Sequence, residues 1–164
     1  MDADTLSEQL IAGPIPADRT EDWAGVRACL ARIKATWDQG DATGYAACFA
    51  AEATYVSFVG TTYLGRQDIL ECHAALFAKF AQGTTMFVTV LDVRFHGDST
   101  ATVLTSGNAT KKPSHQGKVQ TFTFGRVTGG WECVAFQNTK RNTLLERTSY
   151  LFDRRFRPLR ERTL

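Results

Sequence analysis

Apolar side chains recur every three or four positions in residues 20–40 and again in residues 66–80, and this spacing predicts two amphipathic α-helices. Gly40 ends the first helix, and Asp41 caps a short second helix that carries Phe49. We therefore expect three helices in the first half of the chain.

Strand-like segments make up the rest of the predicted domain. After Glu52, ATYVSFV is rich in β-branched and aromatic residues and predicts a strand, which TTYLG follows across Gly60. Residues 84–139 predict four more strands, in the segments TMFVTVLDVRFH, TATVLTSGNA, KVQTFTFGRV and WECVAFQNT. Gly129 and Gly130 can adopt the positive φ angles of a tight turn between the last two. Helices followed by an antiparallel meander predict an α+β fold.

This pattern divides the 164 residues into three parts. Residues 1–19 form a loose lead-in, because Pro14 and Pro16 break any helix. Residues 20–140 form one domain, and residues 141–164 form a C-terminal extension. A chain of this length buries a core large enough to be stable without disulfides.

Composition is typical of a soluble globular domain. Hydrophobic residues make up 43% and charged residues 22% of the chain, and the net charge is only +2, so no broad attraction to nucleic acid is expected. No apolar run approaches the roughly 20 residues that span a bilayer. The acidic start, MDADTLSEQLIAGP, is unlike a secretory signal. We expect a cytoplasmic protein that binds neither a membrane nor nucleic acid.

The sequence carries no motif for a metal or a cofactor. Cys29, Cys48, Cys72 and Cys133 are widely spaced, without a C-x-x-C pair, and are expected to be reduced, packed thiols. His73 has no second metal ligand four residues further on, and neither a glycine-rich phosphate loop nor a G-x-S-x-G nucleophile motif occurs. We therefore expect no bound metal, no cofactor and no covalent hydrolysis.

The C-terminal extension differs in charge from the rest of the chain. Residues 140–164 hold eight basic and three acidic residues, a charge of +5, which leaves −3 for the remainder. Apolar residues such as Leu151 and Phe152 are interleaved with these charges, and a purely electrostatic arm would not need them. We expect an arm that packs on its own subunit or on a partner subunit. The alternatives are a solvated charged face and, last, a nucleic-acid contact.

His73 is the candidate catalytic residue. It lies four residues after Ile69 and four before Phe77, so it points with them from the third helix toward the sheet. A buried imidazole must find a hydrogen bond or lose about 1–3 kcal/mol. His73 is either a neutral core histidine bonded to a backbone carbonyl, or the base or hydrogen-bond donor of a ligand cavity. Burial would lower its pKa and favour the neutral form.

Gln137 is the second polar candidate. Strict alternation along the last strand places Trp131 and Gln137 on one face and Asn138 on the other. The face with Gln137 points inward if the sheet curls around the helices. A buried amide needs a partner, so Gln137 marks either a bound polar ligand or a bond to neighbouring backbone. Asn108 could play the same part.

Aromatic residues from several elements would meet over a curved sheet. The candidate walls of a pocket are Tyr55, Phe58, Tyr63, Phe77 and Trp131. In a filled core these side chains pack against one another, whereas in a hollow cone they line a cavity of roughly 300–1,000 Å³, the usual size of a ligand pocket. The residues themselves leave both possibilities open.

Three strings, WDQGDATGYAACFAAEATYVSFVGTTYLGRQDI, CHAALFAKF and RVTGGWECVAFQNTK, resemble the NTF2-like superfamily in their order and spacing. They cover about residues 22–140 and are most similar to its SnoaL-like branch, in the SgcJ/EcaC subgroup that accompanies enediyne polyketide biosynthesis. The resemblance implies a cone-shaped α+β barrel in which three N-terminal helices pack on a strongly bent antiparallel sheet. It also implies an apolar pocket between them and a homodimer formed through the outer sheet face.

The resemblance implies a pocket function without fixing the reaction. In relatives the pocket serves polyketide cyclisation, steroid isomerisation, dehydration or simple binding, and the isomerases and cyclases rely on an acid in the cavity. Where relatives often carry an inward catalytic residue on the final strand, this chain has Gln137. We therefore expect a pocket protein of secondary metabolism that binds or transforms a small apolar, polyketide-like ligand such as an enediyne precursor.

Two alternatives follow for the activity. An enzyme of this kind would be a cofactor-independent cyclase, isomerase or dehydratase, with His73 as base or donor. Gln137 and Tyr63 or Tyr55 would then orient the ligand, and Phe58, together with the other aromatic walls, would enclose it. The alternative is a non-catalytic dimeric module that recruits biosynthetic partners.

Overall fold

The structure, a computed structural model, describes residues 17–112 and 117–158. Its elements follow one another as η1 (Ala17–Arg19), α2 (Thr20–Gln39), α3 (Ala42–Ala47), β1 (Phe49–Val56), β2 (Thr62–Leu64), α4 (Arg66–Lys79), β3 (Thr85–His96), β4 (Thr100–Thr110), β5 (Lys118–Val127), β6 (Gly130–Lys140), α5 (Thr143–Phe152) and η2 (Arg154–Phe156). Residues 1–16 of the predicted lead-in and residues 159–164 of the extension lie outside the described residues.

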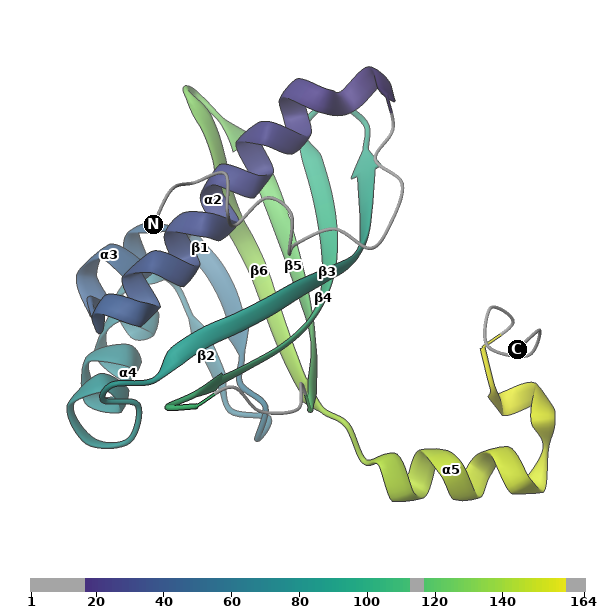
Figure 1. The fold of residues 1–164 in the computed structure, drawn as a ribbon. Helices are drawn as coiled ribbons and strands as arrows, with labels where there is room; N and C mark the ends of the chain where they lie inside the picture. Colours follow the sequence, from purple (N-terminus) through teal and green to yellow (C-terminus); the bar gives the residue numbers. More distant parts are fainter. Residues whose placement is uncertain (1–16, 113–116, 159–164) are drawn as a thin grey trace.

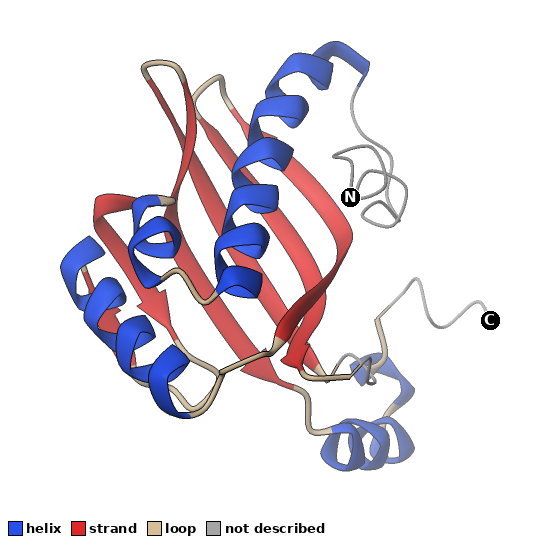
Figure 2. Ribbon diagram, turned by 60° about the vertical axis from the view of Figure 1, so that its left-hand side comes forward, coloured by secondary structure: helices blue, strands red, loops and turns tan. Residues whose placement is uncertain are grey.

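The strands of the described chain form one curved sheet in the order β2-β1-β6-β5-β4-β3. Helices α2, α3 and α4 lie together on one face of this sheet, which bends around them (Figures 1 and 2). This arrangement confirms the predicted α+β cone. One pairing differs from the antiparallel expectation, because β1 and β6 run parallel. Most of the domain's sequence separates these two strands, so no tight turn fixes their relative direction.

The turn between α2 and α3 forms as predicted. Gly40 adopts a φ of +67°, a left-handed conformation that glycine takes without strain, and this ends α2. The Asp41 side chain then accepts a hydrogen bond from the Gly44 N–H (2.9 Å) and caps α3. The helix is shorter than predicted, because Phe49 pairs with Cys133 at the start of β1 instead of continuing α3.

The core lies between the helices and the inner face of the sheet. Its buried residues include Trp23, Val26, Leu30, Ile33, Phe49, Val90, Val103, Phe122 and Phe124. All four cysteines are free thiols; Cys29, Cys48 and Cys133 are buried in this core, and Cys72 is half-buried. Burial raises the pKa of the three buried thiols, which makes them unreactive packing groups.

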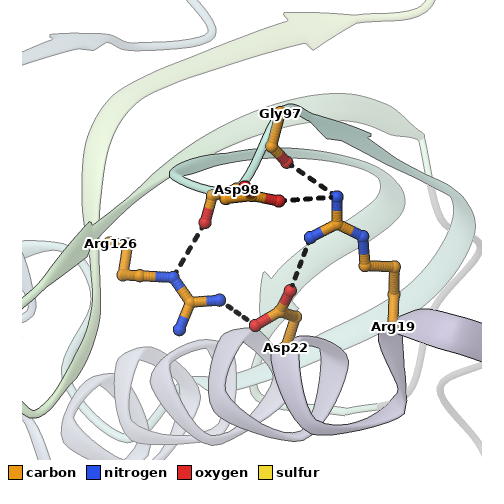
Figure 3. A network of polar contacts seen from close by, with 5 residues as sticks. All are labelled: Arg19, Asp22, Gly97, Asp98 and Arg126. Atoms are coloured by element: carbon orange, nitrogen blue, oxygen red, sulfur yellow. Dashed lines mark hydrogen bonds and ion pairs between the residues drawn. The ribbon is translucent and has the colours of Figure 1, made fainter.

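Ion pairs and hydrogen bonds connect the N-terminus of α2 to the β3–β4 turn at one end of the cone (Figure 3). Asp22 accepts hydrogen bonds from Arg19 (3.0 Å) and from Arg126 of β5. Arg19 also contacts the Asp98 carboxylate (3.0 Å) and the Gly97 carbonyl oxygen (3.2 Å), and Arg126 donates to the Asp98 carbonyl oxygen (2.8 Å). The network ties the helix layer to the sheet at this end.

The C-terminal extension projects away from the sheet after β6 (Figures 1 and 2). Asn142 caps α5 by accepting a hydrogen bond from the Leu145 N–H (3.0 Å). Apolar side chains of this helix face solvent: Leu144, Leu145, Leu151 and Phe152. Among the described residues, no helix is both long and apolar enough to cross a membrane.

Candidate functional site

A cavity of about 400 Å³ lies between α4 and the inner face of the sheet, at the end of the cone away from the network of Figure 3. Every element from α2 to β6 contributes to its wall. Its aromatic lining includes Tyr45, Tyr55, Phe58, Tyr63, Phe122 and Phe136. The volume falls within the usual range of ligand pockets. The cone is therefore hollow at this end.

His73 lies among aromatic rings in the wall of this cavity. Its ring centroid is 4.3 Å from that of Tyr45, 5.1 Å from that of Tyr55 and 5.9 Å from those of Trp37 and Phe77. Only 1% of its surface is exposed. His73 thus packs as a core residue and at the same time borders the cavity, so each interpretation from the sequence describes part of its surroundings.

The hydrogen bond of His73 determines its tautomer. Nδ1 lies 2.8 Å from the Ile69 carbonyl oxygen, which can only accept, so Nδ1 carries the proton and Nε2 carries a lone pair. Nε2 has no partner among the described residues. Burial lowers the pKa of His73 to about 4, with a smaller opposing contribution from the Ile69 carbonyl. The ring is therefore neutral at pH 7, and its Nε2 can accept a proton or a hydrogen bond but cannot donate one.

Two tyrosines beside His73 supply hydroxyl groups. Burial raises the pKa of both Tyr45 and Tyr55. Both phenols therefore remain protonated at neutral pH. A protonated phenol is a hydrogen-bond donor, so either hydroxyl can donate to a ligand oxygen.

Further polar groups lie at one end of strands β1, β5 and β6. Ser57 Oγ and Asn138 Oδ1 are buried atoms without a partner among the described residues, and such atoms commonly mark the place of an absent one. Lys118 adds a positive charge to the same wall. No carboxylate of the described chain lines the cavity, and no group of three or more histidine, cysteine, aspartate or glutamate residues there could hold a metal ion.

The prediction that Gln137 points into the cavity is wrong, because its side chain is exposed on β6. Thr123 pairs with Ala135, but the next residue, Phe124, pairs with Cys133. Val134 is therefore an extra, unpaired residue in β6, which is a β-bulge. One extra residue reverses the alternation of every later side chain. Asn138 therefore faces the cavity in place of Gln137.

Trp131 and Phe77 are buried, as predicted, but neither lines the cavity. Trp131 lies at the far end of β6, seven residues or roughly 23 Å from Asn138. There Gly25 leaves room for its indole, because a Cβ on Gly25 would lie 2.6 Å from Cδ1. Phe77 lies one helical turn beyond His73 and packs against Trp37, with ring centroids 5.2 Å apart. Trp131 therefore packs in the core, and Phe77 packs beside Trp37 outside the lining of the cavity.

The structure does place Tyr55, Phe58 and Tyr63 in the lining, together with His73 and Asn108. The sequence interpretation missed Asn138 and Lys118, however. One signal could have indicated the bulge that turns Asn138 inward, since an isolated glycine in a strand often marks one. Gly125 is such a glycine, and a Cβ there would lie 2.9 Å from Val134 Cγ1.

Comparison with known families now identifies the domain. Residues 18–137 match the family described as the SnoaL-like domain. The chain belongs to this family. No protein of curated function matches the sequence.

Solved structures similar to this SnoaL-like chain have its fold. A domain with a cystatin-like fold from Nostoc punctiforme is 25% identical, and the match covers 88% of this chain and 91% of that one with a TM-score of 0.68. Aln2 from a Streptomyces species is 21% identical, over 82% and 99% of the two chains, with a TM-score of 0.66. An NTF2-like protein with a cystatin-like fold from Novosphingobium aromaticivorans is 24% identical, over 86% and 91%, with a TM-score of 0.61.

These similarities confirm the NTF2-like fold that the sequence strings predicted, and the descriptions of the similar structures call it cystatin-like. The SnoaL-like NTF2 fold is typical of proteins that bind small ligands and of enzymes that work without a cofactor. The fold carries several chemistries, so the reaction has to be argued from the side chains of the cavity.

Proposed function

We propose that this SnoaL-like protein binds a small, apolar, polyketide-like ligand in the cavity beneath α4, as part of cytoplasmic secondary metabolism. The observation that carries the proposal is an aromatic-lined cavity whose wall contains a neutral His73 with an unpartnered Nε2. An apolar cavity with a few convergent polar groups is the usual form of a ligand site. A residue needed only for packing would gain nothing from leaving this nitrogen unbonded.

The aromatic lining of the cavity favours a flat, conjugated molecule as the ligand. Rings from β1, β2, β5 and β6 meet in it, and the Tyr55 and Phe136 centroids lie 4.6 Å apart. Aromatic faces and edges bind other conjugated rings by offset and edge-to-face contacts. The similarity of the sequence strings to the SgcJ/EcaC subgroup supports the same class of ligand, with enediyne precursors as its narrowest member.

If the ligand is transformed, His73 is the base in this proposal. Its neutral Nε2 would take a proton from an acidic C–H or O–H, and the Tyr45–Tyr55 pair would donate a hydrogen bond to the oxygen that becomes negative. A pKa of about 4 makes His73 a weak base, so it would act only on protons that are already acidic, such as those between two carbonyl groups. This is cofactor-independent cyclisation, isomerisation or dehydration. Because His73 is almost fully covered, contact with Nε2 requires a shift of Tyr45 or Tyr55.

Calorimetric titration with emodin, a fused-ring hydroxyanthraquinone, tests the binding proposal. We expect a single site with a dissociation constant of roughly 1–100 μM. A chain ending after Lys140 is the control, since the exposed apolar residues of α5 could capture the dye without any cavity. Equal binding by both chains supports the cavity. The absence of binding up to the solubility limit of emodin, or its loss with the extension, would contradict the proposal.

The alternative proposal is a dimeric interaction module, and the exposed apolar face of α5 favours it. This helix stands clear of residues 20–140, the predicted domain (Figure 1), and Leu151 and Phe152 are each more than 85% exposed. Monomeric proteins seldom leave such side chains grouped in solvent. The proposed occupant of this face is a second copy of the chain.

Truncation after Lys140 is expected to convert a dimer into a monomer, because it removes the apolar face of α5. Light scattering coupled to gel filtration measures the mass of the full and the truncated chain. A full chain that is already monomeric, or a truncated chain that remains dimeric, would contradict self-association through the extension. The second result would instead agree with a dimer formed by the outer face of the sheet.

A further inference from the structure

We propose that the ligand of this cavity is an amphipathic anion, with a flat apolar body among the aromatic rings and a carboxylate bound by Lys118. This inference rests on the proposed function and narrows it to a chemical class. The sequence predicts an apolar ligand, and none of the predicted ligand-binding residues is a lysine or an arginine.

Lys118 lies on the inner face of the sheet. Lys118, Gln120 and Phe122 occupy every second position along β5 and therefore share one face. Gln120 and Phe122 are buried and line the cavity. Its ammonium group lies 4.2 Å from the centroid of the Phe58 ring. Phe58 is 46% exposed, so the pair lies where the cavity meets solvent. Lys118 thus places a positive charge at the mouth of an apolar chamber.

The charge of Lys118 has no counter-ion in the described part of the chain. No carboxylate there lies within ion-pairing distance of its ammonium group, and none lines the cavity. Burial lowers the pKa of Lys118, and the charge of Lys140 lowers it further. A partly desolvated ammonium beside a second cation is unfavourable, and a bound anion relieves both effects.

Polar groups at the same end of the sheet can complete the anion site. Val56 pairs with Gln137, and Gln120 pairs with Asn138, so Ser57, Asn138 and Lys118 lie near the same end of three adjacent strands. Ser57 Oγ is a hydroxyl without a partner among the described residues, and it can donate to a carboxylate oxygen. Lys118 supplies the positive charge, and the Ser57 hydroxyl supplies a hydrogen bond that orients the carboxylate.

A matched pair of ligands tests the inference. 2-Naphthoate and 2-naphthamide have nearly the same shape, and only the first is charged at pH 7. We expect the protein to bind naphthoate about tenfold more tightly, which corresponds to about 1.4 kcal/mol. In a Lys118→Met variant the two ligands should bind alike, because methionine keeps the apolar stem and removes the charge. A Lys140→Met variant is the control and should keep most of the preference, since Lys140 is exposed and does not line the cavity.

The outcomes separate this inference from the proposal on which it rests. If both naphthalenes bind with equal affinity to the wild-type protein, the cavity binds ligands and the inference of an anion is wrong. If the preference survives in Lys118→Met, another group selects the anion, and the inference is equally wrong. If neither naphthalene nor emodin binds, the proposed function itself fails. The inference is supported if the preference for naphthoate is lost in Lys118→Met and retained in the wild-type and Lys140→Met proteins.

Discussion

Acidification from pH 7 to pH 4 is expected to destabilise the wild-type protein by about 3 kcal/mol more than a His73→Phe variant. Burial lowers the pKa of His73 from 6.5 in the unfolded chain to about 4 in the folded protein. Between these values the unfolded chain binds a proton that the folded protein does not bind. The stability contributed by the neutral ring is therefore complete above pH 6.5 and is lost as the pH falls toward 4.

Urea unfolding at pH 7, 5.5 and 4 measures this difference. His96→Gln is the matched control, because it removes an exposed histidine at the end of β3, outside the aromatic residues around His73. His73→Leu serves as a second variant if the larger phenylalanine ring does not fit. Parallel pH profiles for the wild-type and His73→Phe proteins would show that the ring accepts a proton in the folded state, and would contradict its burial among the aromatic rings.

Replacing Ala109 with tryptophan is expected to weaken emodin binding at least about 100-fold, or about 2.7 kcal/mol. Ala109 lines the cavity from β4, on the same face as the buried Thr105 and Gly107. An indole at this position occupies part of the 400 Å³ void, so it competes directly with a ligand. Because it enters empty space, the variant should fold with little loss of stability.

Calorimetry with emodin and urea unfolding of the same preparation measure both effects. Ala75→Trp is the control, since Ala75 is exposed on α4 and its indole would lie outside the cavity. Retention of wild-type affinity in a folded Ala109→Trp protein would mean that emodin binds somewhere else. Loss of affinity in both variants would point to a general effect of added tryptophan.

The elements of the fold could be predicted because their signals are local. Helical spacing in α2 and α4, the left-handed turn at Gly40 and the cap at Asp41 each depend on a few neighbouring residues. The order of helices and strands then gives the layer architecture. The resemblance to NTF2-like proteins added the cone shape, which periodicity does not encode.

The site could be predicted only in part, because it depends on where each strand bends and slips. Alternation fails after the bulge at Val134, so Gln137 and Asn138 exchange faces. Trp131 does point inward but lies too far along β6 to reach the cavity. Lys118 could not be recognised as a site residue, because a lysine at the end of a strand is common. Its contact with Phe58 of the β1–β2 turn joins segments that are far apart in the sequence. His73 was found because a polar ring on an apolar helix face is unusual.

Nitrogen-15 NMR of histidine-labelled protein at pH 7 tests the central claim, which is that a neutral His73 with an unpartnered Nε2 lies in the wall of a ligand cavity. The His73→Phe protein assigns the signal. We predict a protonated Nδ1 and an unprotonated Nε2 whose resonance moves when emodin is added. A ring protonated on Nε2 at pH 7, or an Nε2 resonance that does not move while calorimetry shows emodin bound, would contradict this account.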